Sequence, residues 1–367
     1  MEVMHLKEKE VISTNQYIWL LFCIITAHAT LHVPRLLIFQ AGRDCWLSLL
    51  LAWFLDVLLA IVYAYMGIRF PGQNMVQYSI TILGKIAGSI VGFQFIALFL
   101  FISGALERGL SLVLKKAFFP DVPIEILLIS AFIVIGYGTL KGVEIIGRVC
   151  EILGPIYLIS SITLFVFLLP EVKIDYLKPQ LESGLYPAIS GTPVILSFIG
   201  ICIMMGMFQP ICNKIENAFI GKFTAVSLGV FVIITIAIGS IGVFGLHQSQ
   251  NMITTSLDLA RYIHIGNFFQ RVEAIWMMIA VGATIVTSAV LIWAFSLGFS
   301  QILRLKSYKP LVIPSTLISF AFAVTSADNS IQLTNFIFYT LPILAIYVET
   351  GLEMFLFFAA LITKKRG

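Results

Sequence analysis

Charged residues are scarce in this chain: Asp, Glu, Lys and Arg make up 11% of its 367 residues, whereas hydrophobic residues make up 59%. A soluble domain needs about 25% charged residues to cover its surface. Long polar segments are also lacking, and apolar runs of about 20 residues, enough to cross a bilayer, recur from end to end. The sequence therefore predicts an all-α integral membrane protein, with a single transmembrane domain over residues 1–367.

The motifs that carry enzyme chemistry are lacking as well. The five cysteines are scattered without metal-ligand spacing, and we find no paired carboxylates, nucleophile triad or phosphate-binding loop. The polar N-terminal stretch has no small-residue cleavage site, so we expect no cleaved signal peptide. The net charge of +4 is ordinary for a membrane protein and indicates no nucleic-acid partner. We expect no enzymatic activity, no cofactor and no metal; the lipid bilayer is the surrounding medium.

Ten membrane spans are expected. They lie near residues 17–37, 45–67, 87–114, 122–140, 150–170, 193–209, 221–245, 268–302, 309–327 and 334–360. An N-terminus in the cytoplasm places most Lys and Arg residues in inner segments, with Lys222 counted among the loop cations. We therefore expect a multi-pass protein with both termini in the cytoplasm.

The first span carries unusual polar and helix-breaking residues in the stretch ITAHATLHVPRLL. Pro34 has no backbone N–H, and its ring crowds the carbonyl of Thr30. An interrupted helix survives in lipid only where it faces protein or a wet cavity. We therefore expect a break near residues 26–30, close to His28.

The sixth span shows a comparable pattern, because Gly200, Gly206 and Pro210 fall within eleven residues. Interrupted helices at equivalent places in two halves of five spans point to an inverted-repeat transporter fold with a midplane site. The repeats would cover about 17–170 and about 193–360. The alternative is that Gly and Pro are simply common in membrane helices.

Other polar groups within the spans allow two interpretations. In the eighth span Thr284, Thr287, Ser288 and Leu291 share one helix face, and these hydroxyls either bind a ligand or cation or join helices to each other. Asp56 lies in mid-span, where a carboxylate is by default a candidate for proton binding. The alternative is a protonated side chain that is only hydrogen-bonded within the bundle.

Two glutamates in the tenth span have a simpler expected role. Glu349 and Glu353 are four residues apart on one helix face near its inner end, so we expect them to meet loop cations.

Six stretches resemble the B subunit of bacterial spore germinant receptors, a branch of the amino acid/polyamine/organocation transporter superfamily. They are ISTNQ (12–16), VPRLL (33–37), AGRDCWLSLL (41–50), GVEIIGRVCEILGP (142–155), LKPQLESG (177–184) and FFQRVEAIW (268–276). The resemblance covers nearly the whole chain, and it rests on the order and spacing of stretches that carry no catalytic motif.

The resemblance implies a leucine-transporter-like fold of two inverted five-helix repeats, with helices 1 and 6 interrupted. It also implies a nutrient sensor, typically for an amino acid, that lies in the spore inner membrane with A and C subunits. Carried onto this chain, the ligand-binding residues are Ala27, His28, Ala29, Leu98, Ile102, Ile199, Gly200, Thr287 and Leu291. Asp56 and Ser288 are the expected proton or cation positions.

This chain departs from the family pattern at two places. It has Ala27-His28-Ala29 where family members often have Gly-x-Gly, and Cys202 where an acidic residue is frequent. Two other functional classes stay open, because sensors and transporters share such a pocket: a proton- or sodium-coupled amino acid permease, and an ion channel opened by a partner.

Overall fold

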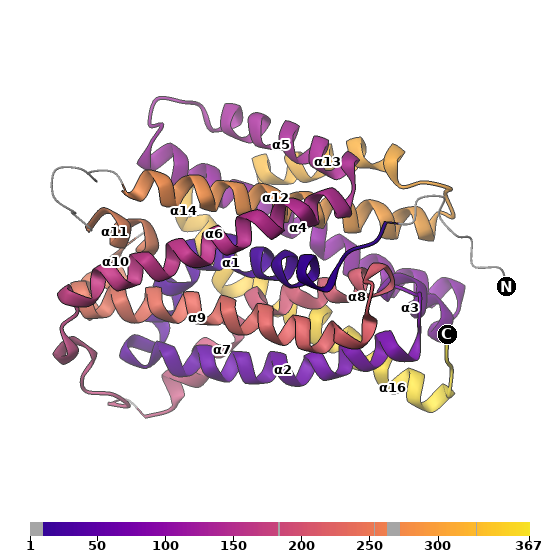
Figure 1. Ribbon diagram of the computed structural model, residues 1–367, viewed down its shortest axis with the longest axis horizontal. Coiled ribbons are helices and arrows are strands. Elements are labelled where there is room, and N and C mark those ends of the chain that lie inside the picture. Colours follow the sequence, from indigo (N-terminus) through magenta and orange to yellow (C-terminus); the bar gives the residue numbers. More distant parts are fainter. Residues whose placement is uncertain (1–9, 183, 253, 263–271, 328) are drawn as a thin grey trace.

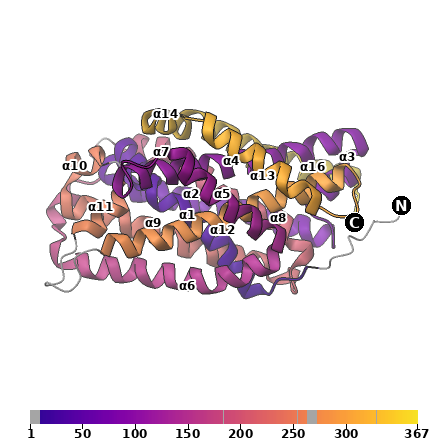
Figure 2. The same cartoon turned by 90° about the horizontal axis from the view of Figure 1, so that it is seen from above.

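The computed structural model describes residues 10–182, 184–252, 254–262, 272–327 and 329–367 (Figure 1). These residues form a bundle in which the long helices run along one axis, and the first and last described residues, Glu10 and Gly367, lie toward the same end of it (Figures 1 and 2). The short helices α10 (Leu246–Asn251) and α11 (Thr255–Tyr262) lie at the opposite end of the bundle (Figure 1). The described residues contain no strand, only an isolated bridge between Ile12 and Cys212.

Eight long α-helices make up most of the bundle. They are α1 (Thr14–Ala41), α2 (Cys45–Arg69), α4 (Lys85–Ala117), α5 (Ile124–Lys141), α6 (Val143–Leu168), α9 (Ala218–Phe244), α12 (Val272–Ile302) and α13 (Lys309–Thr325). Two further chains of short helices run beside them. The first is α7 (Tyr186–Ile199), η4 (Gly200–Met204), α8 (Met205–Phe208) and η5 (Gln209–Ile211); the second is α14 (Ser330–Asn335), η7 (Phe336–Thr340), α15 (Leu341–Ala345), η8 (Ile346–Leu352) and α16 (Glu353–Thr363).

Short helices connect these elements. They are η1 (Gly42–Asp44), α3 (Met75–Leu83), η2 (Leu169–Glu171), η3 (Ile174–Leu177), η6 (Ile215–Asn217), α10 (Leu246–Asn251) and α11 (Thr255–Tyr262). Each of the ten expected spans coincides with one long helix or one of the two chains of short helices, although the first four residues of the eighth span, 268–271, lie outside the described residues.

The bundle has the dimensions and composition of a multi-pass membrane protein. Eight helical stretches in the described residues are long and apolar enough to cross a bilayer; one of them joins the second half of α1 to α2, and α13 is slightly shorter with 17 residues. Large apolar side chains such as Ile86, Ile133 and Met278 are exposed on the outward faces of their helices. Exposed apolar faces on long helices fit lipid as the surrounding solvent.

The first helix differs from the expectation, because α1 is α-helical throughout from Thr14 to Ala41, with Pro34 inside it. The break predicted at residues 26–30 is therefore wrong. The hydroxyls of Thr26 and Thr30 donate to the carbonyls of Phe22 and Thr26 over 2.8 Å, within the same helix. Alanine, which occupies positions 27 and 29, is the best helix former, so the local sequence supports winding where glycines would weaken it.

Side chains of neighbouring helices also donate hydrogen bonds to backbone carbonyls of α1. Thr284 and Thr287 of α12 donate to the carbonyls of Ala27 and Cys23 over 3.3 and 3.2 Å. Tyr157 of α6 donates to the carbonyl of Thr26 over 3.3 Å. These donors come from distant parts of the sequence, which is why the local pattern around Pro34 is misleading.

The sixth span is interrupted as expected. The α-helix α7 ends at Ile199, and the chain continues in the tighter 3-10 helix η4, which begins at Gly200. The last span holds two π-helical segments, η7 and η8, that the sequence did not predict. π-Helical turns are rare and occur frequently at functional sites.

Candidate functional site

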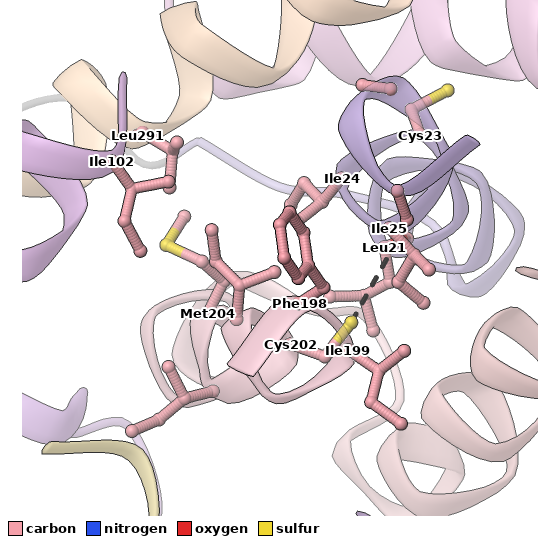
Figure 3. Packing of buried hydrophobic residues seen from close by; sticks show 14 of the residues in the cluster. Leu21, Cys23, Ile24, Ile25, Ile102, Phe198, Ile199, Cys202, Met204 and Leu291 are labelled. Carbon is pink, nitrogen blue, oxygen red and sulfur yellow. Dashed lines mark hydrogen bonds between the residues drawn. The ribbon is translucent and has the colours of Figure 1, made fainter. Parts of the chain in front are cut away.

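The expected pocket residues belong to α1, α4, α7, η4 and α12. Eight of them are buried: Ala27, Ala29, Leu98, Ile102, Ile199, Gly200, Thr287 and Leu291. The side chain of His28 lies outside the described part of the structure. Figure 3 shows Ile102 and Leu291 on one side of this region, with Phe198 and Ile24 opposite them.

A cavity of about 30 Å³ lies between α1, α4, the α7–η4 junction and the last helix chain. Its walls are Ile24, Ile102, Ala105, Leu106, Ser197, Phe198, Ile201, Leu333, Phe336, Ile337 and Leu341. Only Ile102 belongs to the expected set, although Phe198 and Ile201 flank the expected Ile199 and Gly200. The one wall hydroxyl, that of Ser197, donates to the carbonyl of Val194 over 2.7 Å. The cavity is thus small and mostly apolar, and it lies at the break in α7.

A larger cavity of about 340 Å³ lies beside the first one, toward the end opposite the termini. It is lined by Arg35, Leu36, Gly109, Leu112, Val113, Lys116, Ala117, Asn251, Met252, Thr254, Leu257, Asp258, Arg261, Leu333, Thr334 and Ile337. Leu333 and Ile337 line both cavities, so these two side chains form the wall between them. Of these two cavities, only the larger one has charged lining residues: Arg35, Lys116, Arg261 and Asp258.

The hydroxyls of α12 are used between helices. Besides the bonds of Thr284 and Thr287 to α1, Ser288 donates to Oε1 of Glu107 in α4 over 2.7 Å. Glu107 is fully buried, and its Oε2 has no hydrogen-bond partner in the described structure. Arg108, its neighbour, is also buried and donates from Nε to the carbonyl of Ala327 over 2.7 Å. The structure therefore places a buried carboxyl group beside Ser288, one of the two expected proton or cation positions.

Asp56, the other expected position, forms a buried ion pair. The ammonium of Lys222 in α9 lies 2.9 Å from Oδ1 of Asp56, with 0% and 1% of the two side chains exposed. Lys222 also lies over the ring of Tyr63, 4.7 Å from the centroid. The count of Lys222 as a loop cation is therefore wrong. A sequence signal for the pair does exist. Lys222 is the one charged residue of α9, and Asp56 lies in the middle of the second span; two opposite charges in apolar spans are expected to pair with each other.

Glu349 and Glu353 belong to the same region of the core. Both are buried, and the hydroxyl of Tyr78 in α3 lies 2.9 Å from each carboxylate oxygen of Glu353. The hydroxyl of Tyr63 donates to the backbone carbonyl of Glu349. Neither glutamate forms an ion pair with a loop cation within the described residues, contrary to expectation. Glu349 lies in the π-helical η8 and Glu353 begins α16, and both side chains are buried in the bundle.

Comparison with known proteins shows which family this chain resembles. The profile of the family described as "Spore germination protein" matches residues 11–331. Among curated proteins of Bacillus subtilis, spore germination protein YndE is 26% identical over 301 residues, covering 80% of this chain and 82% of its own. Spore germination protein KB is 24% identical over 339 residues, covering 89% of each chain.

Solved transporter structures share the fold. MhsT in complex with L-phenylalanine matches with a TM-score of 0.70 and 13% identity, over 96% of this chain and 89% of MhsT. Mhp1, a nucleobase-cation-symport-1 family transporter, matches with a TM-score of 0.65 and 13% identity, over 91% and 76%. The expected leucine-transporter-like fold is thereby confirmed, and these neighbours are transporters and not enzymes. The profile match covers most of the chain, which therefore belongs to the spore germination protein family.

Proposed function

We propose that this chain is the nutrient-sensing B subunit of a spore germinant receptor, acting with A and C subunits in the spore inner membrane. The observation that carries the proposal is the interrupted α7, which meets α1 and α4 at a small cavity beneath a larger one. Family membership supplies the link to germination.

The ligand under this proposal is a small nutrient, with an amino acid as the leading class. It enters the larger cavity, passes Leu333 and Ile337, and expands the small cavity at the break in α7. The proposed contacts are those carried over from the family: Ala27, His28, Ala29, Leu98, Ile102, Ile199, Gly200, Thr287 and Leu291. Ligand binding then shifts the population of a bistable bundle, and the partner subunits relay that shift.

The proposed topology has both termini in the cytoplasm, supported by Lys364, Lys365 and Arg366 at the C-terminal end. The larger cavity lies toward the opposite end of the bundle, and thus on the side from which nutrients reach the inner membrane.

A proton- or sodium-coupled permease is the second candidate function, favoured by the buried ionisable partners of Asp56 and Ser288. Under that function these two residues serve ion coupling. Labelled amino acids offered to the purified protein in liposomes separate the two classes. Binding without uptake supports the sensor, whereas concentrative uptake that depends on an ion gradient supports the permease.

The pocket is tested by Thr287→Leu and His28→Leu in spores. The expected result is an altered nutrient response at an unchanged protein level. Thr325→Leu is the matched control, because Thr325 is exposed and bonds only to its own helix, at the carbonyls of Ala321 and Phe322. A parental response from both pocket variants overturns the assigned pocket.

A further inference from the structure

Buried ionisable groups gather where α2, α9 and η4 meet the last helix chain. Asp56, Glu349 and Glu353 supply three carboxyl groups, and Lys222 supplies one ammonium. All four side chains are at most 2% exposed. Fully ionised, this group would carry a net charge of about −2 within the bundle, which is costly in a low-dielectric interior.

The hydrogen bonds show which carboxyl group lacks compensation. Lys222 is committed to Asp56 at 2.9 Å, and Glu353 accepts from Tyr78. Oε1 of Glu349 is buried and has no hydrogen-bond partner in the described structure. A charged carboxylate at this position would form no ion pair within the described structure and would leave Oε1 without a donor, so the neutral acid is the form that fits.

Glu349 also touches the interrupted helix. A Cβ on residue 200 would collide with Oε2 of Glu349, so the carboxyl group rests directly on the backbone of Gly200. Glu349 lies in the π-helical η8, and Gly200 begins the 3-10 helix η4. Two segments with non-standard winding therefore meet at this contact.

We propose that Glu349 is a proton-binding site that controls the break in α7. The protonated side chain packs on Gly200 and holds η4 in place. When the proton leaves to water, the uncompensated charge moves away from Gly200 toward Lys222, and η4 loses its support. The proposal goes beyond nutrient sensing, and its test needs no nutrient.

Other ionisable groups face this site from every neighbouring element. Asp56 and Tyr63 of α2, Lys222 of α9 and Cys202 of η4 act electrostatically on Glu349. Glu353 of α16 and Tyr78 of α3 lie one step further away, in contact with each other and within electrostatic range of Tyr63. Lys222 is the one cation in this set, and its ammonium is already paired with Asp56.

Infrared spectroscopy of the purified chain in lipid nanodiscs tests the proton directly. At neutral pH the parent is expected to show a C=O band of a protonated carboxylic acid that Glu349→Gln removes and that fades as pH rises. Glu353→Gln is the matched control, since it removes a neighbouring buried carboxyl group that does not touch Gly200, and it should keep the band. An identical band in parent and Glu349→Gln overturns the proposal.

Hydrogen–deuterium exchange of peptides covering residues 198–206 tests the control of the break. After correction for intrinsic exchange, protection in the parent should fall several-fold over the pH range in which the band is lost, while Glu349→Gln stays protected throughout. Equal pH dependence in both proteins, or none in the parent, contradicts the proposal. Should Glu349→Gln fail to fold, Gly200→Ala is measured in its place. The added methyl group displaces the carboxyl group of Glu349, so we expect low protection of residues 198–206 at every pH. Protection equal to that of the parent contradicts the proposal.

Discussion

The ammonium of Lys222 lies 2.9 Å from Oδ1 of Asp56, although 166 positions separate the two residues in the sequence. Breaking a buried ion pair leaves one uncompensated charge, which typically costs about 3–5 kcal/mol. We expect Asp56→Leu and Lys222→Met each to destabilise the protein by about this amount. The double variant Asp56→Leu/Lys222→Met should recover most of the loss, because apolar groups then replace both charges.

Thermal unfolding in detergent measures these differences. Glu144→Gln is the control, since it removes the exposed pair between Glu144 and Arg148, for which we expect less than about 1 kcal/mol. Additive losses in the double variant would show that the two charges do not support each other.

The continuous winding of α1 leads to a second prediction. Ala27→Gly and Ala29→Gly each replace the best helix former with a poor one, at a cost of about 1 kcal/mol. We expect faster hydrogen–deuterium exchange in peptides covering residues 22–33, with no change in peptides of α13. Unchanged exchange near residues 26–30 would mean that α1 is held by its neighbours alone.

Local sequence patterns account for much of the fold and for less of the site. The hydropathy of the sequence locates all ten spans, and Gly200 and Pro210 indicate the break in the sixth. Both predictions succeed because the length of an apolar run and the backbone preferences of Gly and Pro can be read from neighbouring residues alone. The continuity of α1 was missed, since Thr284, Thr287 and Tyr157 reach it from helices far along the chain.

The interior charge network was missed for a similar reason. Lys222 lies near the start of an apolar helix, where a cation resembles an ordinary loop residue until Asp56 is brought against it. The π-helical winding around Glu349 has no signature in the local sequence, because it depends on what the last helix packs against.

The pH dependence of stability should show a contribution from Asp258, in α11 at the larger cavity. Partial burial raises the pKa of this carboxyl above its usual value, against the opposing charges of Arg261 and Lys116. The folded state therefore holds the proton more tightly than the unfolded chain does. Its stabilising contribution is complete below the unfolded pKa and is lost as pH rises through the folded pKa.

Thermal unfolding of the parent and Asp258→Asn across the acidic range checks this sign. The melting temperature of the parent should fall relative to that of the variant as pH rises through this window, and the difference should then level off. Asp121→Asn serves as the control, because Asp121 is exposed in the turn before α5. A difference that changes in the opposite direction would contradict the assignment.

The wall between the two cavities gives the last prediction. Leu333 is 3% exposed and separates the larger cavity from the small one beside Ile201. In an Ile201→Cys background, Leu333→Ala should speed labelling by a small charged thiol reagent about tenfold, which corresponds to about 1.4 kcal/mol in the barrier. The background labelling is measured on the parent without the Ile201→Cys change and is subtracted from each rate. The native cysteines of the parent are buried, except for the half-buried Cys212.

Leu344→Ala is the matched control, because Leu344 lies on the same helix chain, is exposed and lines neither cavity. It should leave the labelling rate of Cys at position 201 unchanged. Equal rates for Leu333→Ala and Leu344→Ala would show that small molecules do not reach the break in α7 through this wall, and the entry route proposed for the nutrient would then have to lie elsewhere.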